Sequence, residues 1–275
     1  MWRAIFFMLI GMMLIPAGDA ASKLLSNDHG FQPYFIAWAR FALGSLLFLP
    51  FVPRSCLKVF RNPLAWIRGA LLAVGISSIT VAVSLEGLVD VISVFFVGPI
   101  VSYILAVIFL KEAISIQRTA LLMIGFFGIL IITRAGFGFS IGFVFALLAG
   151  TAYGVFLTLS RITAHQEEPQ GLLISQMVIA AVITTPLALL HWPSQNLETL
   201  GLLTVSGASS MLGNLFLILA YARAPATRLA PFIYFQLISA LFLGWILFDT
   251  IPDGWGLLGL GFLLISGFGS AFLRR

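Results

Sequence analysis

The amino-acid sequence predicts an all-α polytopic membrane protein whose ten transmembrane helices form two inverted five-helix repeats. Hydrophobic residues make up 60% of the 275 residues and charged residues only 9%, whereas a soluble domain carries about 25% charged residues. Ten stretches are apolar over about the 20 residues that a helix needs to cross a bilayer. Because five is odd, a second set of five helices enters the membrane from the side opposite to the first. Such inverted halves are typical of secondary transporters.

The expected spans of the first half are bounded by residues that interrupt helices. The first span ends before the polar run Asn27-Asp28-His29-Gly30, the second ends at Pro53, and the fifth ends before Arg134. We assign residues 1–134 to the first repeat. Its spans are expected over residues 3–22, 34–53, 68–86, 91–110 and 116–133.

The second half follows the same plan. His191-Trp192-Pro193 ends the seventh span, Pro225 separates the eighth span from the ninth, and Pro252-Asp253-Gly254 divides the last two. We assign residues 140–275 to the second repeat. Its spans are expected over residues 140–161, 170–191, 199–221, 227–248 and 254–272.

The distribution of Lys and Arg predicts the orientation of the chain. Basic residues accumulate in cytoplasmic segments of membrane proteins. If the chain starts inside, the outer side holds only Lys23 and Arg134, and Arg40 lies inside a span. We therefore expect both termini in the cytoplasm and the chain in a plasma membrane, the inner membrane of a bacterium. The basic residues on the expected inner side are Arg3, Arg54, Lys58, Arg61, Arg68, Lys111, Arg118, Arg161, Arg223, Arg228, Arg274 and Arg275.

The fourth and ninth expected spans align with each other without gaps. Residues 89–112 read VDVISVFFVGPIVSYILAVIFLKE and residues 226–249 read ATRLAPFIYFQLISALFLGWILFD. Phe95 then matches Phe232, and Glu112 matches Asp249, so that each segment ends on an acidic residue. This internal similarity supports a repeat of five helices.

These segments resemble the drug/metabolite transporter superfamily, in particular its EamA-type family of ten-helix proteins. The matching motifs are Asp19-Ala-Ala-Ser-Lys23, Trp38-Ala-Arg40-Phe41, the run from Ser93 to Pro99, and the run from Ala230 to Gln236. The resemblance implies a secondary carrier of a small organic metabolite that works by alternating access between two inverted halves. Members carry amino acids, S-adenosylmethionine, riboflavin, drugs and other small organic solutes.

Three ionisable residues within the expected membrane region are the first candidates for substrate binding or gating. A charged side chain in a bilayer costs about 3 kcal/mol even on a lenient scale, so it is a functional hypothesis by default. Asp19 and Lys23 share one face of the first helix, and Arg40 lies at similar depth in the second. Arg40 would hold a carboxylate, and Asp19 an amine or a coupling proton. The structural alternative is an ion pair that locks the two helices together, with Lys23 reaching the outer surface.

Uncharged polar and aromatic residues complete the candidate site. Amide and phenol groups need partners away from lipid and should face the bundle interior, where they would suit a planar or aromatic solute. Interhelical hydrogen bonding is the alternative for each. Gly98 and Pro99 form the expected hinge in the fourth span. Glu86 and Asp90 would line an outer vestibule or, as is commoner, be solvated carboxylates of a loop. The polar and aromatic candidates are Trp38, Tyr103, Tyr153, Gln176, Asn214, Tyr234 and Gln236.

The sequence argues against other functional classes. A membrane metalloprotease would need His-Glu-x-x-His, but the three histidines are scattered over loops and span ends. We therefore expect no enzyme, no metal site and no cofactor. The net charge of +5 arises from basic residues at helix ends, which fits membrane topology better than nucleic-acid binding. A channel or a non-transporting structural membrane protein is the alternative. Small-residue faces permit a homodimer as well as internal packing.

Overall fold

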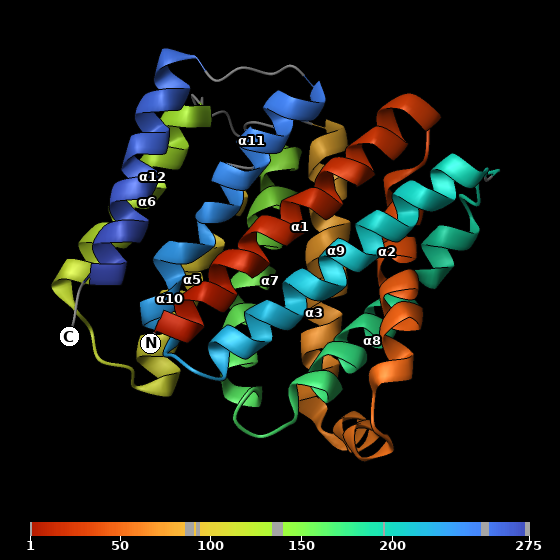
Figure 1. Cartoon of the computed structure of the whole chain (residues 1–275), viewed down its shortest axis with the longest axis horizontal. Coiled ribbons are helices and arrows are strands. Elements are labelled where there is room, and N and C mark those ends of the chain that lie inside the picture. The colour runs from red at the N-terminus through yellow and green to blue at the C-terminus, as the bar shows by residue number, and fades with distance from the viewer. Residues whose placement is uncertain are drawn as a thin grey trace.

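The computed structural model describes residues 2–85, 91, 94–133, 140–194, 196–248 and 253–272, and every regular element in these ranges is a helix. Candidate residues Glu86 and Asp90 lie outside the described residues. Figure 1 shows the course of the chain. The elements are α1 (Trp2–His29), α2 (Pro33–Phe48), η1 (Leu49–Phe51), η2 (Arg54–Arg61), α3 (Pro63–Leu85), α5 (Gly98–Leu110), α6 (Ile116–Thr133), α7 (Ile141–Thr163), α8 (Pro169–Leu189), α9 (Leu197–Tyr221), α10 (Ala226–Ile233), α11 (Phe235–Phe248) and α12 (Gly254–Phe272).

Local sequence signals account for the start of several helices. Proline stands in the first turn of α2, α5 and α8, where its missing N–H and fixed φ cost nothing. Asn196 begins α9 with a reciprocal capping box, in which the Asn196 side chain accepts from the Thr199 N–H at 2.8 Å. Such caps satisfy backbone groups that the first helical turn leaves without partners.

The helices are those of a polytopic membrane protein. Seven of those in the described part of the chain are long and apolar enough to cross a bilayer, and the number is eight if η2 and α3, which meet at 83°, count as one bent span. The segments Gly98–Leu110 and Ile116–Ile132 are apolar but shorter. Large apolar side chains such as Phe109 and Leu264 are exposed on the outside, as expected where lipid is the solvent.

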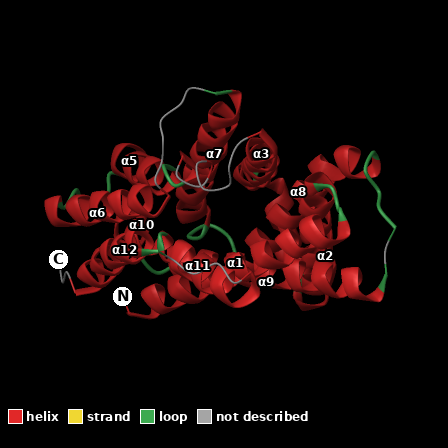
Figure 2. Cartoon of the chain, turned by 90° about the horizontal axis from the view of Figure 1, so that it is seen from above, coloured by secondary structure: helices red, strands yellow, loops and turns green. Residues whose placement is uncertain are grey.

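The helices form two layers with a helix pair at each side (Figure 2). One layer contains α3, α5 and α7, in which α7 packs against both of the others. The other contains α1, α9, α10 and α11, in which α1 packs against all three partners. The pairs α6–α12 and α2–α8 close the two sides. Helices far apart in the sequence therefore lie next to each other.

The helix contacts have a regular pattern. The helix α1 packs against α9 and α11, and α7 packs against α3 and α5. If α1 is matched with α7, α3 with α9, and α5 with α10 and α11, these contacts correspond to one another. Under the same matching the pairs α2–α8, α6–α12 and α5–α10 correspond to themselves.

Glycines allow the closest of these contacts. A Cβ on Gly150 would lie 2.5 Å from the Phe95 carbonyl oxygen, and a Cβ on Gly154 would lie 2.6 Å from that of Gly98. The Gly-x-x-x-Gly pattern of the sixth span therefore packs within the chain, with α7 against α5. Its small residues let the two backbones approach each other closely.

Each of the two aligned segments contains a short break in its helix. A turn at Phe96–Val97 precedes α5, and Tyr234 separates α10 from α11. Val97 and Tyr234 occupy equivalent positions in the alignment of these two segments. The expected hinge residues Gly98 and Pro99 stand in the first turn of α5, and their role as a hinge stays a prediction.

Both ends of the chain lie at the same end of the bundle (Figure 1). The segment η2 lies at this end as well and carries the exposed side chains of Arg54, Lys58 and Arg61. It is fixed to the second half, since the Asn62 amide donates to Glu167 at 2.9 Å and the Cys56 thiol donates to Glu168 at 3.0 Å. Burial and the Glu168 carboxylate raise the pKa of the Cys56 thiol.

Candidate functional site

A cavity of about 850 Å³ lies between the two layers of helices. Its walls come from α1 and α2, from α3 and α7, from Phe95 and Phe96, and from α9 and α11. The lining extends along α1 to Asn27, which is exposed at the end opposite to the chain termini. The cavity is therefore open at the α1–α2 end. Its size suits a small organic solute.

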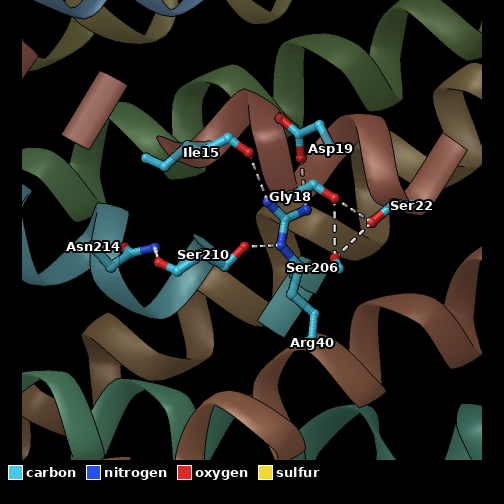
Figure 3. A network of polar contacts seen from close by, with 8 residues as sticks. All are labelled: Ile15, Gly18, Asp19, Ser22, Arg40, Ser206, Ser210 and Asn214. Carbon is cyan, nitrogen blue, oxygen red and sulfur yellow. Dashed lines mark hydrogen bonds and ion pairs between the residues drawn. The ribbon is translucent and has the colours of Figure 1, made fainter. Parts of the chain in front are cut away.

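An ion pair between α1 and α2 forms one wall of the cavity (Figure 3). Arg40 Nη1 donates to Asp19 Oδ1 at 2.6 Å, and Arg40 Nε donates to Ser210 Oγ on α9. The Arg40 side chain is only 11% exposed, whereas the Asp19 side chain is 49% exposed. The guanidinium is thus held by several acceptors, and the carboxylate still faces the solvent of the cavity.

Small residues around this pair bring α1 and α9 together. Ser206 Oγ donates to the Gly18 carbonyl at 3.0 Å, and Ser22 Oγ donates to the same oxygen at 2.8 Å. A Cβ on Gly18 would lie 3.2 Å from Arg40 Nη2. Glycine at this position therefore leaves room for the guanidinium to pass between the two helices.

Aromatic rings form the facing wall. The Phe95 and Tyr153 rings stack with centroids 5.3 Å apart at 28°, and the Tyr153 and Phe156 rings follow at 6.1 Å and 17°. All three residues line the cavity, together with Phe96. Offset stacking of this kind is favourable. It makes this wall of the cavity aromatic and apolar.

A second polar network lies behind the cavity. Arg68 of α3 is fully buried, and its Nη2 donates to Gln176 Oε1 of α8 at 2.6 Å. Gln176 Nε2 then donates to Asn214 Oδ1 of α9 at 3.0 Å, and Asn214 lines the cavity. Arg68 was expected in a cytoplasmic segment, and its place in this buried network was not predicted. Pro63 could have indicated it, because a helix that begins at Pro63 carries Arg68 into the bundle.

The structure brings together some of the predicted site residues and separates others. Asp19, Lys23, Arg40, Tyr153, Asn214 and Gln236 line the cavity. Gln176 lies directly behind it. Trp38 lies outside the lining and donates to Thr185 Oγ1 at 3.0 Å, next to Trp192. Tyr103 and Tyr234 are also outside the lining; Tyr103 hydrogen-bonds Thr119 at 2.7 Å, and Tyr234 packs edge-on against Phe96.

The end of the bundle that holds the chain termini is closed by Glu112. Lys111 ends α5 in the left-handed conformation, with φ of 53°, and the chain turns so that Glu112 reaches the start of α10. The Glu112 carboxylate accepts from the Ala226 N–H at 3.0 Å and from the Thr227 N–H at 2.8 Å. A carboxylate at a helix N-terminus is favourable because it satisfies free N–H groups and the helix dipole.

Arg161 of α7 strengthens this closure. Its Nε lies 3.5 Å from Glu112 Oε1, and its Nη1 donates to the Tyr221 carbonyl of α9 at 2.5 Å. Arg161 also donates to His165 Nε2. Burial and the Arg161 charge lower the pKa of His165, so that the ring stays neutral at pH 7 and accepts this hydrogen bond. Arg161 thus joins α7 of one layer to α9 of the other at this end of the bundle.

The described residues contain no group of three or more His, Cys, Asp or Glu side chains that would hold a metal ion. The polar groups that line the cavity are instead the ion pair of Asp19 and Arg40, the Lys23 ammonium, amides and hydroxyls. Such a set can bind and release a solute by hydrogen bonds, charge and stacking.

Comparison with known proteins agrees with this picture. The sequence profile of the EamA-like transporter family matches residues 2–134 and again residues 140–272. An S-adenosylmethionine uptake transporter of Rickettsia bellii is 28% identical over 250 residues, which cover 89% of this chain and 85% of the relative. A riboflavin transporter of Rhizobium johnstonii is 26% identical over 277 residues, covering 96% and 90%.

A solved structure shares the fold. A crystal structure of another protein superposes with a TM-score of 0.81 and covers 98% of this chain and 96% of its own, at 15% identity. At this identity the likeness concerns the fold alone. The whole chain therefore adopts an arrangement that exists in an experimental structure.

Proposed function

Because this chain belongs to the EamA-like transporter family, and is accordingly a membrane transporter of a small metabolite and no enzyme, we propose that it carries an adenosine-bearing amino acid of the S-adenosylmethionine type. The observation that carries this proposal is one cavity with an ion pair on one wall and stacked aromatic rings on the other. S-Adenosylmethionine has matching parts, namely an amino-acid group, a sulfonium cation and a planar adenine.

The ion pair suits the charged part of this substrate. The amine and the sulfonium would lie near the exposed carboxylate of Asp19, and the substrate carboxylate near the donors of Arg40. Arginine binds carboxylates through two parallel N–H donors. In a cavity with low dielectric these contacts are stronger than in water. The site would thus favour a zwitterionic or cationic solute over a neutral one.

The aromatic wall suits the adenine. Phe95, Phe96 and Tyr153 line the cavity, and stacking of a base on an aromatic side chain contributes about 1–3 kcal/mol in nucleic-acid complexes. Gln236 on α11 adds an amide to the same cavity. The two walls would therefore hold the two ends of one ligand.

The transport mechanism that we propose is alternating access between two inverted five-helix halves, residues 1–134 and 140–275. The two matches to the family profile, the exchange pattern of helix contacts and the equivalent breaks at Val97 and Tyr234 support ten crossings in two repeats. Interrupted helices near a central site are typical of such carriers. The two layers would rock about the cavity.

The orientation that we propose places both termini in the cytoplasm of a bacterium. The basic side chains of η2 lie at the end of the bundle where the termini lie, as the positive-inside rule requires. In this orientation the cavity opens outward, and the closure at Glu112 faces the cytoplasm. The structure would then represent the outward-open state of an inner-membrane carrier.

Riboflavin is the second candidate substrate. Its fused ring system would fit the aromatic wall, and the similarity to a riboflavin transporter favours it. It has no amino-acid group, however, and would leave the pair of Asp19 and Arg40 without a charged ligand. This difference separates the two candidates experimentally.

We expect S-adenosylmethionine to raise the melting temperature of the purified protein by several degrees, since a ligand that binds only the folded state stabilises it by mass action. Methionine and adenosine, each carrying one half of the recognised groups, should have smaller effects. A rise with riboflavin and none with S-adenosylmethionine would replace the first candidate by the second. No rise with either compound would refute the proposed substrate class.

A further inference from the structure

Arg68 is an unusual residue for the interior of a membrane protein. It is fully buried, and its guanidinium lies 5.0 Å from the centroid of the Phe156 ring. Its Nε donates to Ser160 Oγ at 3.1 Å, and its Nη1 donates to the Leu172 carbonyl at 3.3 Å. Among the described residues, no carboxylate lies within ion-pair distance of it. A buried cation held by neutral acceptors alone is costly, which suggests a role beyond packing.

The chemistry of arginine fixes the orientation of the next side chain. A guanidinium has only donors, so the Gln176 amide must turn its oxygen toward Arg68, as the 2.6 Å contact shows. The Gln176 NH2 group therefore faces Asn214. An amide without such a neighbour would be free to adopt the reverse orientation, because its two ends have nearly the same shape.

Gln176 in turn fixes the orientation of the Asn214 amide at the cavity. Asn214 Oδ1 accepts from Gln176 Nε2 at 3.0 Å, and Asn214 Nδ2 donates to the Ser210 carbonyl at 2.9 Å. The amide oxygen of Asn214 is thus turned toward Gln176, and the second N–H of its NH2 group is left for a ligand. Next to it, Ser210 Oγ already accepts from Arg40, as Figure 3 shows.

Asn214 therefore offers an N–H donor to the cavity. A ligand ring that meets Asn214 must present an acceptor there, such as a ring nitrogen or a carbonyl oxygen. A ligand with a C–H at that position would leave buried N–H groups without partners, which costs about 1–3 kcal/mol. Arg68 itself does not line the cavity and acts through Gln176.

We propose that Arg68 is a positioning residue for substrate specificity, which fixes the amides of Gln176 and Asn214 so that the cavity wall donates hydrogen bonds and selects a heteroaromatic ring with an acceptor edge. The inference rests on the proposed function, since it assumes that the substrate ring lies in this cavity. The residues that line the cavity do not by themselves predict this preference for a ring with an acceptor edge.

Gln176→Glu is the sharpest test. The substitution keeps the shape of the side chain and gives Arg68 a carboxylate partner. It removes the N–H donor, however, so that the Asn214 amide should turn its NH2 group toward residue 176 and its oxygen toward the cavity. Arg68→Lys keeps a cation that has only donors but loses the planar fork of arginine, so the preference survives in this variant if donation toward Gln176 is what orients the amides. Arg68→Gln removes the constraint without adding a charge.

The readout is the ratio of dissociation constants for adenosine and its 1-deaza, 3-deaza and 7-deaza analogues, each of which replaces one ring nitrogen by C–H. We expect the wild-type protein and Arg68→Lys to prefer adenosine over at least one analogue by about tenfold. In Gln176→Glu and Arg68→Gln the ratio should fall to near unity. Melting temperatures without ligand verify that each variant is folded.

The outcomes distinguish the role of Arg68 from the proposed substrate. If the folded variants keep the wild-type ratio, or if the wild-type protein binds adenosine and all analogues equally, the role of Arg68 is refuted and the proposed substrate stands. If neither adenosine nor S-adenosylmethionine binds the wild-type protein, the proposed substrate is refuted and the preference for an acceptor edge with it. If Arg68→Gln does not fold, Gln176→Glu alone decides.

Discussion

Arg40→Lys is expected to weaken substrate binding and uptake by about tenfold or more, because truncating one partner of a buried hydrogen-bonded charge pair costs about 2–5 kcal/mol. Arg40 donates through separate nitrogens to Asp19, Ser210 and the Ile15 carbonyl. Lysine keeps the charge but cannot donate from a planar fork. The measurement is the affinity of purified protein for S-adenosylmethionine, together with uptake into proteoliposomes.

The control is Arg54→Lys, which makes the same chemical change at an exposed position on η2 and should leave binding unchanged. Asp19→Asn should abolish the preference for a cationic ligand while riboflavin binding, if present, is kept. The ion pair would have only a packing role if Arg40→Lys and Asp19→Asn both bound S-adenosylmethionine like the wild-type protein.

Glu112→Gln is expected to open the end of the bundle that Glu112 closes, which is the cytoplasmic end in the proposed orientation, and to shift the population toward the state that is open there. Glu112 accepts from two backbone N–H groups of α10, from the Thr227 hydroxyl at 2.8 Å, and faces Arg161. Its side chain is only 10% exposed. Hydrogen bonds to a charged group contribute about 1.5–3 kcal/mol each, and a glutamine amide accepts with one oxygen only. A shift of about tenfold in the ratio of the two states follows from the loss of one such bond.

The measurement is the rate at which a maleimide reagent applied from the side of this end modifies the Leu229→Cys variant in a Cys56→Ser background. Leu229 is fully buried on α10, so modification requires opening of this end. The rate should rise about in proportion to the open population. Glu168→Gln removes a carboxylate at the same end that accepts from Cys56 of η2 and should leave the rate unchanged. Equal rates in the wild-type protein and Glu112→Gln would show that Glu112 does not hold this end closed.

The sequence was sufficient to predict an all-helical polytopic membrane protein and a contact between Asp19 and Arg40. Hydropathy identified a membrane protein, and the cost of charges in lipid singled out Asp19 and Arg40. In the structure Arg40 Nη1 lies 2.6 Å from Asp19 Oδ1. The same cost directed Asn214 and Gln236 toward the interior. These inferences need only depth along a helix, which residue spacing provides.

Other features depend on the rotation and packing of helices, which spacing does not provide. Trp38 belongs to the same motif as Arg40, yet it faces Thr185 and Trp192 instead of the cavity. Arg68 was counted with the cytoplasmic charges because hydropathy rises only after it. The structure instead starts α3 at Pro63 and buries Arg68 completely. Neighbours supplied by α7 and α8 make that burial possible, and they are distant in sequence.

Counterflow in proteoliposomes tests most directly whether one chamber is reached alternately from the two sides. Vesicles loaded with unlabelled S-adenosylmethionine should take up external labelled S-adenosylmethionine faster than empty vesicles, with a transient excess inside and saturation at high concentration. The variant Arg40→Lys should lose the effect. Uptake that neither saturates nor responds to internal substrate would contradict a carrier and indicate a channel.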